Sequence, residues 1–79
     1  MNKSRLRWQC RRGMRELDEL VVWYLETRFD DADDEQKSAF QALLELPDPE
    51  LMGYLLGKQM PEQESIRGVV ESIRSRNPE

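Results

Sequence analysis

The apolar residues of this 79-residue chain recur three and four positions apart along almost its whole length, and no segment shows the alternation of a half-buried strand. This spacing predicts helices over residues 3–9, 14–29, 34–46, 48–57 and 61–76. The last helix should end before Asn77-Pro78. The connections between these segments are short. We therefore predict an all-α fold, a compact bundle of about five short helices in a single domain over residues 1–79.

Capping residues mark two of the predicted helix starts. Asp33 should cap the helix that begins at residue 34, with Gln36 three positions later as in a capping box. Asp48 should cap the next helix, because Pro49 then occupies the first helical position, where a missing N–H costs nothing. Gly57 is expected to end that helix.

The helical spacing also predicts the core. A chain this short buries only about 60% of the surface that its unfolded form exposes, so stability should be marginal. Cys10 is the only cysteine, and no internal disulfide can add to the core. We interpret Cys10 as a small buried or half-buried hydrophobe, with a reactive thiol as the alternative. The predicted inward positions are Leu6, Cys10, Met14, Leu17, Val21, Tyr24, Leu25, Phe40, Leu43, Leu44, Leu51, Met52, Leu55, Leu56, Ile66, Val69, Val70 and Ile73.

The composition disfavours catalysis. The chain has no histidine, the side chain most often used for proton transfer near neutral pH and a common metal ligand. A single cysteine without histidine makes a cysteine nucleophile improbable, and the four glycines form no phosphate loop. Asp30, Asp31, Asp33 and Asp34 lack EF-hand spacing, so we interpret them as a solvated turn and helix cap instead of a calcium site. The sequence predicts a protein that is not an enzyme and has no metal site.

Charge is distributed unevenly along the chain. Residues 16–64 are strongly acidic, and such polarity can orient the molecule towards a partner. A nucleic-acid site is disfavoured, because the acidic body would repel the same polyanion. No apolar run approaches the roughly 20 residues of a membrane span, and no secretory signal begins the chain, so we expect a cytoplasmic protein. Residues 1–15 contain no acid and these basic residues: Lys3, Arg5, Arg7, Arg11, Arg12 and Arg15.

The join of the first two predicted helices carries a candidate docking surface. If the second helix reaches back to Arg12, an advance of ~100° per residue places Arg12, Glu16, Glu19 and Trp23 on one stripe opposite the core. Tryptophan and arginine are often energetically dominant at interfaces. An ion pair between Arg12 and Glu16 is a weaker interpretation, since arginine before glutamate is the poorer order within a helix. The arginines could instead complete the end of the first helix.

Two further alternatives stay open at this join. Gly13 either ends the first helix or provides a place where a side chain would obstruct a partner. Trp8 and Trp23 are each either exposed or covered by neighbouring helices.

Arg12-Gly13, followed after two residues by Glu16, resembles the signature of the flavin assembly factors of succinate dehydrogenase, called SdhE in bacteria. The likeness continues through the segment with Phe40, Leu43 and Leu44 and through Asp48-Pro49-Glu50-Leu51, and so covers nearly the whole chain. Tyr54 departs from the pattern, since many relatives carry tryptophan there. Further similar residues surround the signature: Trp8, Cys10, Arg11, Met14, Leu17 and Asp18.

The resemblance implies a five-helix protein that binds the flavoprotein subunit of succinate dehydrogenase, and often fumarate reductase, and promotes covalent attachment of FAD to that subunit. It implies no tightly bound cofactor, because the partner holds the FAD. Arg12 and Glu16 would project towards the client, Gly13 would permit close approach, and Arg11 and Arg15 would flank them. We expect a monomer. An antitoxin-like binding module is the alternative. The predicted partner-binding residues are Trp8, Arg11, Arg12, Gly13, Arg15, Glu16 and Glu19.

Overall fold

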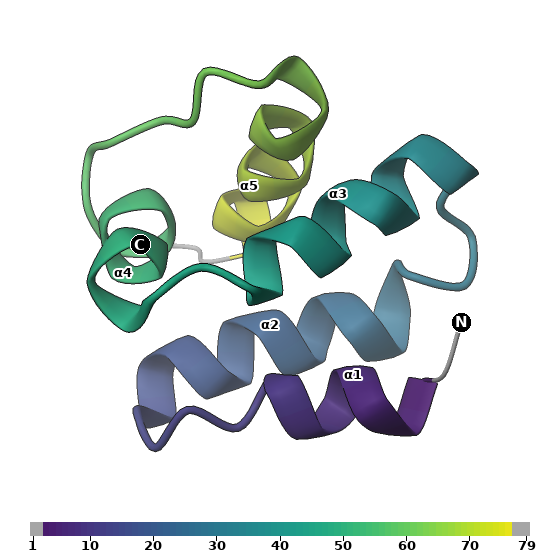
Figure 1. The fold of residues 1–79 in the computed structure, drawn as a ribbon, viewed down its shortest axis with the longest axis horizontal. Coiled ribbons are helices and arrows are strands. Elements are labelled where there is room, and N and C mark those ends of the chain that lie inside the picture. The colour runs from purple at the N-terminus through teal and green to yellow at the C-terminus, as the bar shows by residue number, and fades with distance from the viewer. Residues whose placement is uncertain (1–2, 77–79) are drawn as a thin grey trace.

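The computed structural model describes residues 3–76, and this part of the chain contains helices and no strand. The helices are α1 (Lys3–Gln9), α2 (Arg15–Thr27), α3 (Asp34–Leu44), α4 (Asp48–Leu55) and α5 (Glu64–Arg76). α1 runs along α2, and α5 packs against α2, α3 and α4 (Figure 1). The radius of gyration is 11.3 Å. The predicted all-α bundle of five short helices is confirmed.

The helix boundaries differ from the predicted ones by a few residues. α2 begins at Arg15, and the Tyr24 carbonyl at its end accepts hydrogen bonds from the N–H groups of both Arg28 and Phe29, each at 2.9 Å. α3 ends at Leu44, two residues early, and α5 begins at Glu64 instead of near residue 61. The predicted stop at Asn77-Pro78 lies outside the described residues.

One predicted cap is confirmed and the other is wrong. The Asp33 side chain accepts a hydrogen bond from the Gln36 N–H at 2.8 Å, and it caps α3 as expected. Pro47 precedes α4 instead, which makes Asp48 the first helical residue, and its carboxylate binds Arg12. Gly57 follows the end of α4. A Cβ at this position would lie 2.8 Å from the Gly53 carbonyl oxygen, so close backbone packing requires glycine there.

Most of the predicted core is buried. Leu56 is an error, since its side chain is 38% exposed at the end of α4. The prediction omitted Leu20, Phe29 and Ala39, which are buried. The core residues are Leu6, Cys10, Leu17, Leu20, Val21, Tyr24, Leu25, Phe29, Ala39, Phe40, Leu43, Leu44, Leu51, Leu55, Val69, Val70 and Ile73, with Met14, Met52 and Ile66 partly buried against them.

Cys10 is completely buried, as a small hydrophobe would be. Removal from water raises the pKa of the thiol from 9.0 to about 11, and the positive charge of Arg12 only partly opposes this rise. The thiol is therefore protonated near neutral pH. This confirms the interpretation of Cys10 as a packing residue, since the thiolate is the reactive form.

Ion pairs join the basic helix α1 to acidic residues in the last turn of α2 and just beyond it. Lys3 Nζ lies 3.0 Å from Asp30 Oδ2, and Arg7 Nη2 lies 3.4 Å from Glu26 Oε2. These pairs fit an antiparallel arrangement of α1 and α2. Exposed pairs of this kind contribute roughly 0.2–1 kcal/mol each, so they orient α1 more than they stabilise it. Among the described residues, no helix is both long and apolar enough to cross a membrane.

Candidate functional site

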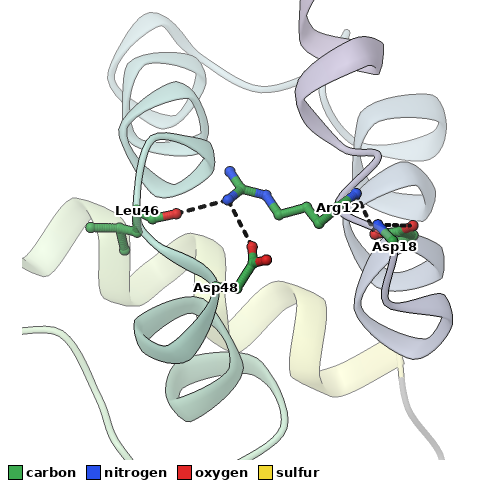
Figure 2. Close-up of polar contacts among 5 residues, drawn as sticks. Arg12, Asp18, Leu46 and Asp48 are labelled. Carbon is green, nitrogen blue, oxygen red and sulfur yellow. Dashed lines mark hydrogen bonds and ion pairs between the residues drawn. The ribbon is translucent and has the colours of Figure 1, made fainter.

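The loop over residues 10–14 joins α1 to α2, and Asp18 organises it. The Asp18 carboxylate accepts hydrogen bonds from the main-chain N–H groups of Arg12, at 2.9 Å, and Gly13, at 3.3 Å. Figure 2 shows Asp18 beside the start of the Arg12 side chain. A carboxylate in the first turn of α2 is also favoured by the helix dipole. No such role was predicted for Asp18 from the sequence. The available signal was an acidic residue in the first turn of a helix that begins shortly after a glycine.

Gly13 has a backbone φ of +80°, in the left-handed region that favours glycine. α1 already ends at Gln9, so Gly13 lies in the turn between the two helices and not at the end of the first. A Cβ at this position would meet nothing within 4 Å. The backbone conformation therefore favours glycine here, and the space outside the turn is open.

Arg12 points inward, and the prediction that it projects from an exposed stripe with Glu16 is wrong. Because α2 begins at Arg15, Arg12 lies in the loop and not on the stripe. Its Nη1 donates to the Leu46 carbonyl oxygen at 2.8 Å and to Asp48 Oδ1 at 3.1 Å (Figure 2). The side chain is only 14% exposed, and its Nε is buried without a hydrogen-bond partner.

The other charged residues of the predicted site lie on the outside of α2. Arg15 is 91% exposed, and its Nε forms an ion pair with Glu19 Oε2 at 3.5 Å. Glu16 is also exposed. It stands three positions from Glu19, so the two carboxylates are neighbours on the helix surface. Trp23 is half-buried and packs against the core. The Arg28 guanidinium lies over its ring, 5.6 Å from the ring centre.

Trp8 is 76% exposed on α1. It lines a surface hollow together with Ser4, Arg7 and Arg11. Arg11 also borders a second hollow, whose other lining residues are Asp18, Glu19 and Val22. Arg11 therefore links the exposed indole to the charged side of α2. We name this continuous exposed surface the α1–α2 face; its residues are Trp8, Arg11, Arg15, Glu16 and Glu19.

The α1–α2 face offers contacts and no reactive group. It presents charges of both signs around one aromatic side chain, and the nearby Cys10 thiol is buried and protonated. Within residues 3–76, no three histidine, cysteine, aspartate or glutamate residues gather as a metal site would require. In the acidic turn before α3, Asp33 serves as a cap and Asp30 pairs with Lys3. The chemistry that this arrangement supports is binding.

Comparisons with known proteins match almost the whole chain. A family model described as "Flavinator of succinate dehydrogenase" matches residues 4–77. An FAD assembly factor SdhE of Yersinia pseudotuberculosis is 42% identical over 76 residues, which are 96% of this chain and 86% of that protein. The SdhE of Pectobacterium atrosepticum is 40% identical over the same shares. That of Idiomarina loihiensis is 39% identical over 95% of this chain and 83% of its own length. The matched range includes the α1–α2 face and all contacts of Arg12.

Proposed function

Because this chain belongs to the family of flavinators of succinate dehydrogenase, we propose that it binds the flavoprotein subunit of that enzyme and promotes covalent attachment of FAD to it. The match to the family confirms the resemblance drawn from the Arg12-Gly13 and Glu16 signature. A flavoprotein subunit of fumarate reductase is proposed as a second client.

The exposed indole of Trp8 is the observation that carries the proposal. A tryptophan that is 76% exposed leaves a large apolar surface in water, and Arg7 of α1 and Arg11 of the following loop line the same hollow. Tryptophan and arginine are the residue types that most often dominate binding energy at protein interfaces. The acidic side chains of Glu16 and Glu19 extend the same face, so it can recognise basic as well as acidic groups of a client.

In this proposal the residues of the chain position the client and take no part in the reaction. Trp8 inserts into an apolar pocket of the client, and Arg11 and Arg15 orient the approach through charge. Gly13 allows the client backbone to come close, because no side chain fills the open space outside the turn. The bond-forming chemistry belongs to the flavin and to the subunit that holds it. The assembly factor needs only to hold that subunit in a competent geometry.

Covalent flavin in the client tests this proposal. The flavoprotein subunit is expressed in cells that lack this protein and are then supplied with variants of it, and bound flavin is measured by fluorescence in a denaturing gel. Trp8→Ala and Glu16→Ala should each strongly reduce the fluorescence. The matched controls are Met60→Ala and Glu62→Ala, which change exposed residues of the α4–α5 connection.

Normal fluorescence with both Trp8→Ala and Glu16→Ala would remove the α1–α2 face from the function. Affinity purification of the wild-type protein gives a second check. Recovery of a toxin instead of a flavoprotein subunit would replace the proposal by the antitoxin-like alternative, which would use the same face.

A further inference from the structure

Arg12 connects two loops that are far apart in the sequence. It lies in the loop between α1 and α2, whereas Leu46 and Asp48 lie where α3 passes into α4. The Arg12 side chain spans the space between these loops and ends on both acceptors (Figure 2). The Arg12 side chain therefore connects the α1–α2 pair to the α3–α4 pair.

The position of the guanidinium leaves little of it for a partner. A single nitrogen, Nη1, makes both contacts, at 2.8 Å to the Leu46 carbonyl and 3.1 Å to Asp48. Nε is enclosed by the protein, and the side chain as a whole is 14% exposed. With Nε enclosed and Nη1 engaged twice, a client could take this guanidinium as a planar, bidentate donor only by displacing a contact of Nη1.

The main chain of the same residue is held from the opposite side. Asp18 of α2 binds the N–H groups of Arg12 and Gly13, while the Arg12 side chain binds the α3–α4 connection. The loop is thereby fixed to α2 through its main chain and to the α3–α4 connection through the Arg12 side chain. Arg11, directly before this anchored pair, and Arg15, two positions after it, belong to the α1–α2 face.

We infer that Arg12 is a positioning residue that does not touch the client. It fixes the loop so that Trp8 and Arg11 on one side, and Glu16 on the other, are presented to the client together. This inference rests on the function proposed above. α1 has only seven residues, too few for a stable isolated helix, so its placement depends on such tertiary contacts. A face that is already ordered loses less entropy when a partner binds.

The affinity for purified flavoprotein subunit that lacks covalent flavin tests the inference. The variants are Arg12→Met, which removes the donors but keeps an apolar stem, Asp48→Ala, and the double variant. Each single change should weaken binding roughly 10-fold. The double variant should show about the same loss instead of ~100-fold, because Asp48 acts on the loop only through its contact with Arg12. Glu50→Ala is the matched control, since Glu50 is another acid in the first turn of α4.

A conservative variant separates positioning by Arg12 from a general loss of structure. Because one nitrogen makes both contacts, the ammonium of Arg12→Lys can replace it, and this variant should bind within ~3-fold of the wild type. Circular dichroism establishes that each variant is folded at the assay temperature. If Arg12→Met does not fold, Asp48→Ala and Arg12→Lys still give opposite expected results.

Two outcomes overturn the inference, and they are distinguishable. Wild-type affinity in Asp48→Ala, together with a loss in Arg12→Met, would show that Arg12 contacts the client directly. No binding of the subunit by the wild-type protein would remove the proposed function and, with it, the role assigned to Arg12.

Discussion

The charged groups on the two sides of the α1–α2 loop differ in their exposure and in their contacts. On the inner side, Arg12 and Asp18 bind specific acceptors and donors of other segments, and little of Arg12 reaches solvent. On the outer side, the α1–α2 face holds Arg15 and Glu19 in a loose exposed pair beside an uncovered indole. The inner contacts determine where the loop lies. The outer groups lose little by exchanging water for another molecule, which suits them to binding.

The largest expected effect is a dependence of the free energy of unfolding on pH, caused by Cys10 on the inner side of the loop. Burial raises the pKa of the Cys10 thiol from 9.0 to about 11, so the folded protein retains this proton at a pH where the unfolded chain has lost it. The stabilisation is fully present below pH 9 and is lost as the pH rises to about 11. The free energy of unfolding should fall by roughly 2–3 kcal/mol over this range. Chemical denaturation at a series of pH values measures it.

The variant Cys10→Ala is the control for this pH dependence. Burial also raises the pKa of the Tyr24 hydroxyl above its ordinary value of 10.0, which acts in the same direction. The Cys10→Ala protein should therefore retain only the Tyr24 part of the decline. An unchanged decline in this variant would show that the thiol is not the group responsible.

The second prediction separates the two tryptophans. Trp8→Ala should weaken binding to the flavoprotein subunit by about 2 kcal/mol, as expected of an interface residue that a client buries, and should leave the unfolding temperature unchanged. Trp23→Ala should lower the unfolding temperature, because Trp23 packs against the core. Calorimetric titration and thermal unfolding of both variants check this. A lower unfolding temperature for Trp8→Ala with unchanged affinity would reverse the assignment.

The third prediction concerns the turn between the two sides. Gly13→Ala should destabilise the fold by about 1 kcal/mol, since an L-residue at a φ of +80° is strained even where its Cβ has open space. Gly68→Ala is the matched control. Gly68 lies inside α5 with open space around its Cβ, so alanine should stabilise that helix by roughly 0.5–1 kcal/mol. Urea unfolding compares them, and equal effects of the two changes would contradict the strain argument.

The features that the sequence predicts correctly are those that depend on neighbouring residues. The spacing of Leu17, Val21 and Tyr24 is a property of one helix, and the bond between Asp33 and Gln36 spans three positions. Both follow from helical geometry alone, without knowledge of how the helices pack. The order and approximate extent of all the described helices were therefore predictable.

The errors arise where distant segments meet. The partner of Arg12 is Asp48, 36 residues away, and no periodicity reveals such a contact. Asp48, whose carboxylate binds Arg12, is the first residue of α4 and does not have the capping role expected of an aspartate before proline. α2 starts at Arg15 because Asp18 and the left-handed turn at Gly13 hold the preceding backbone out of the helix. Helical phase thus assigned Arg12 to the exterior, whereas its side chain points inward and connects two loops.

The smallest expected effect compares two arginines only three positions apart. Arg15→Gln removes a 91% exposed guanidinium whose ion pair with Glu19 lies within one helix turn, so the free energy of unfolding should change by about 0.3–0.5 kcal/mol at most. Arg12→Gln breaks contacts between segments and leaves Asp48 without its partner, which should cost about 2 kcal/mol. Thermal unfolding at low and high salt measures both, because screening should reduce the Arg15 effect and spare most of the Arg12 effect. Equal, salt-sensitive losses would mean that Arg12 behaves as a surface residue in solution, and the distinction between the inner and outer sides of the loop would fail.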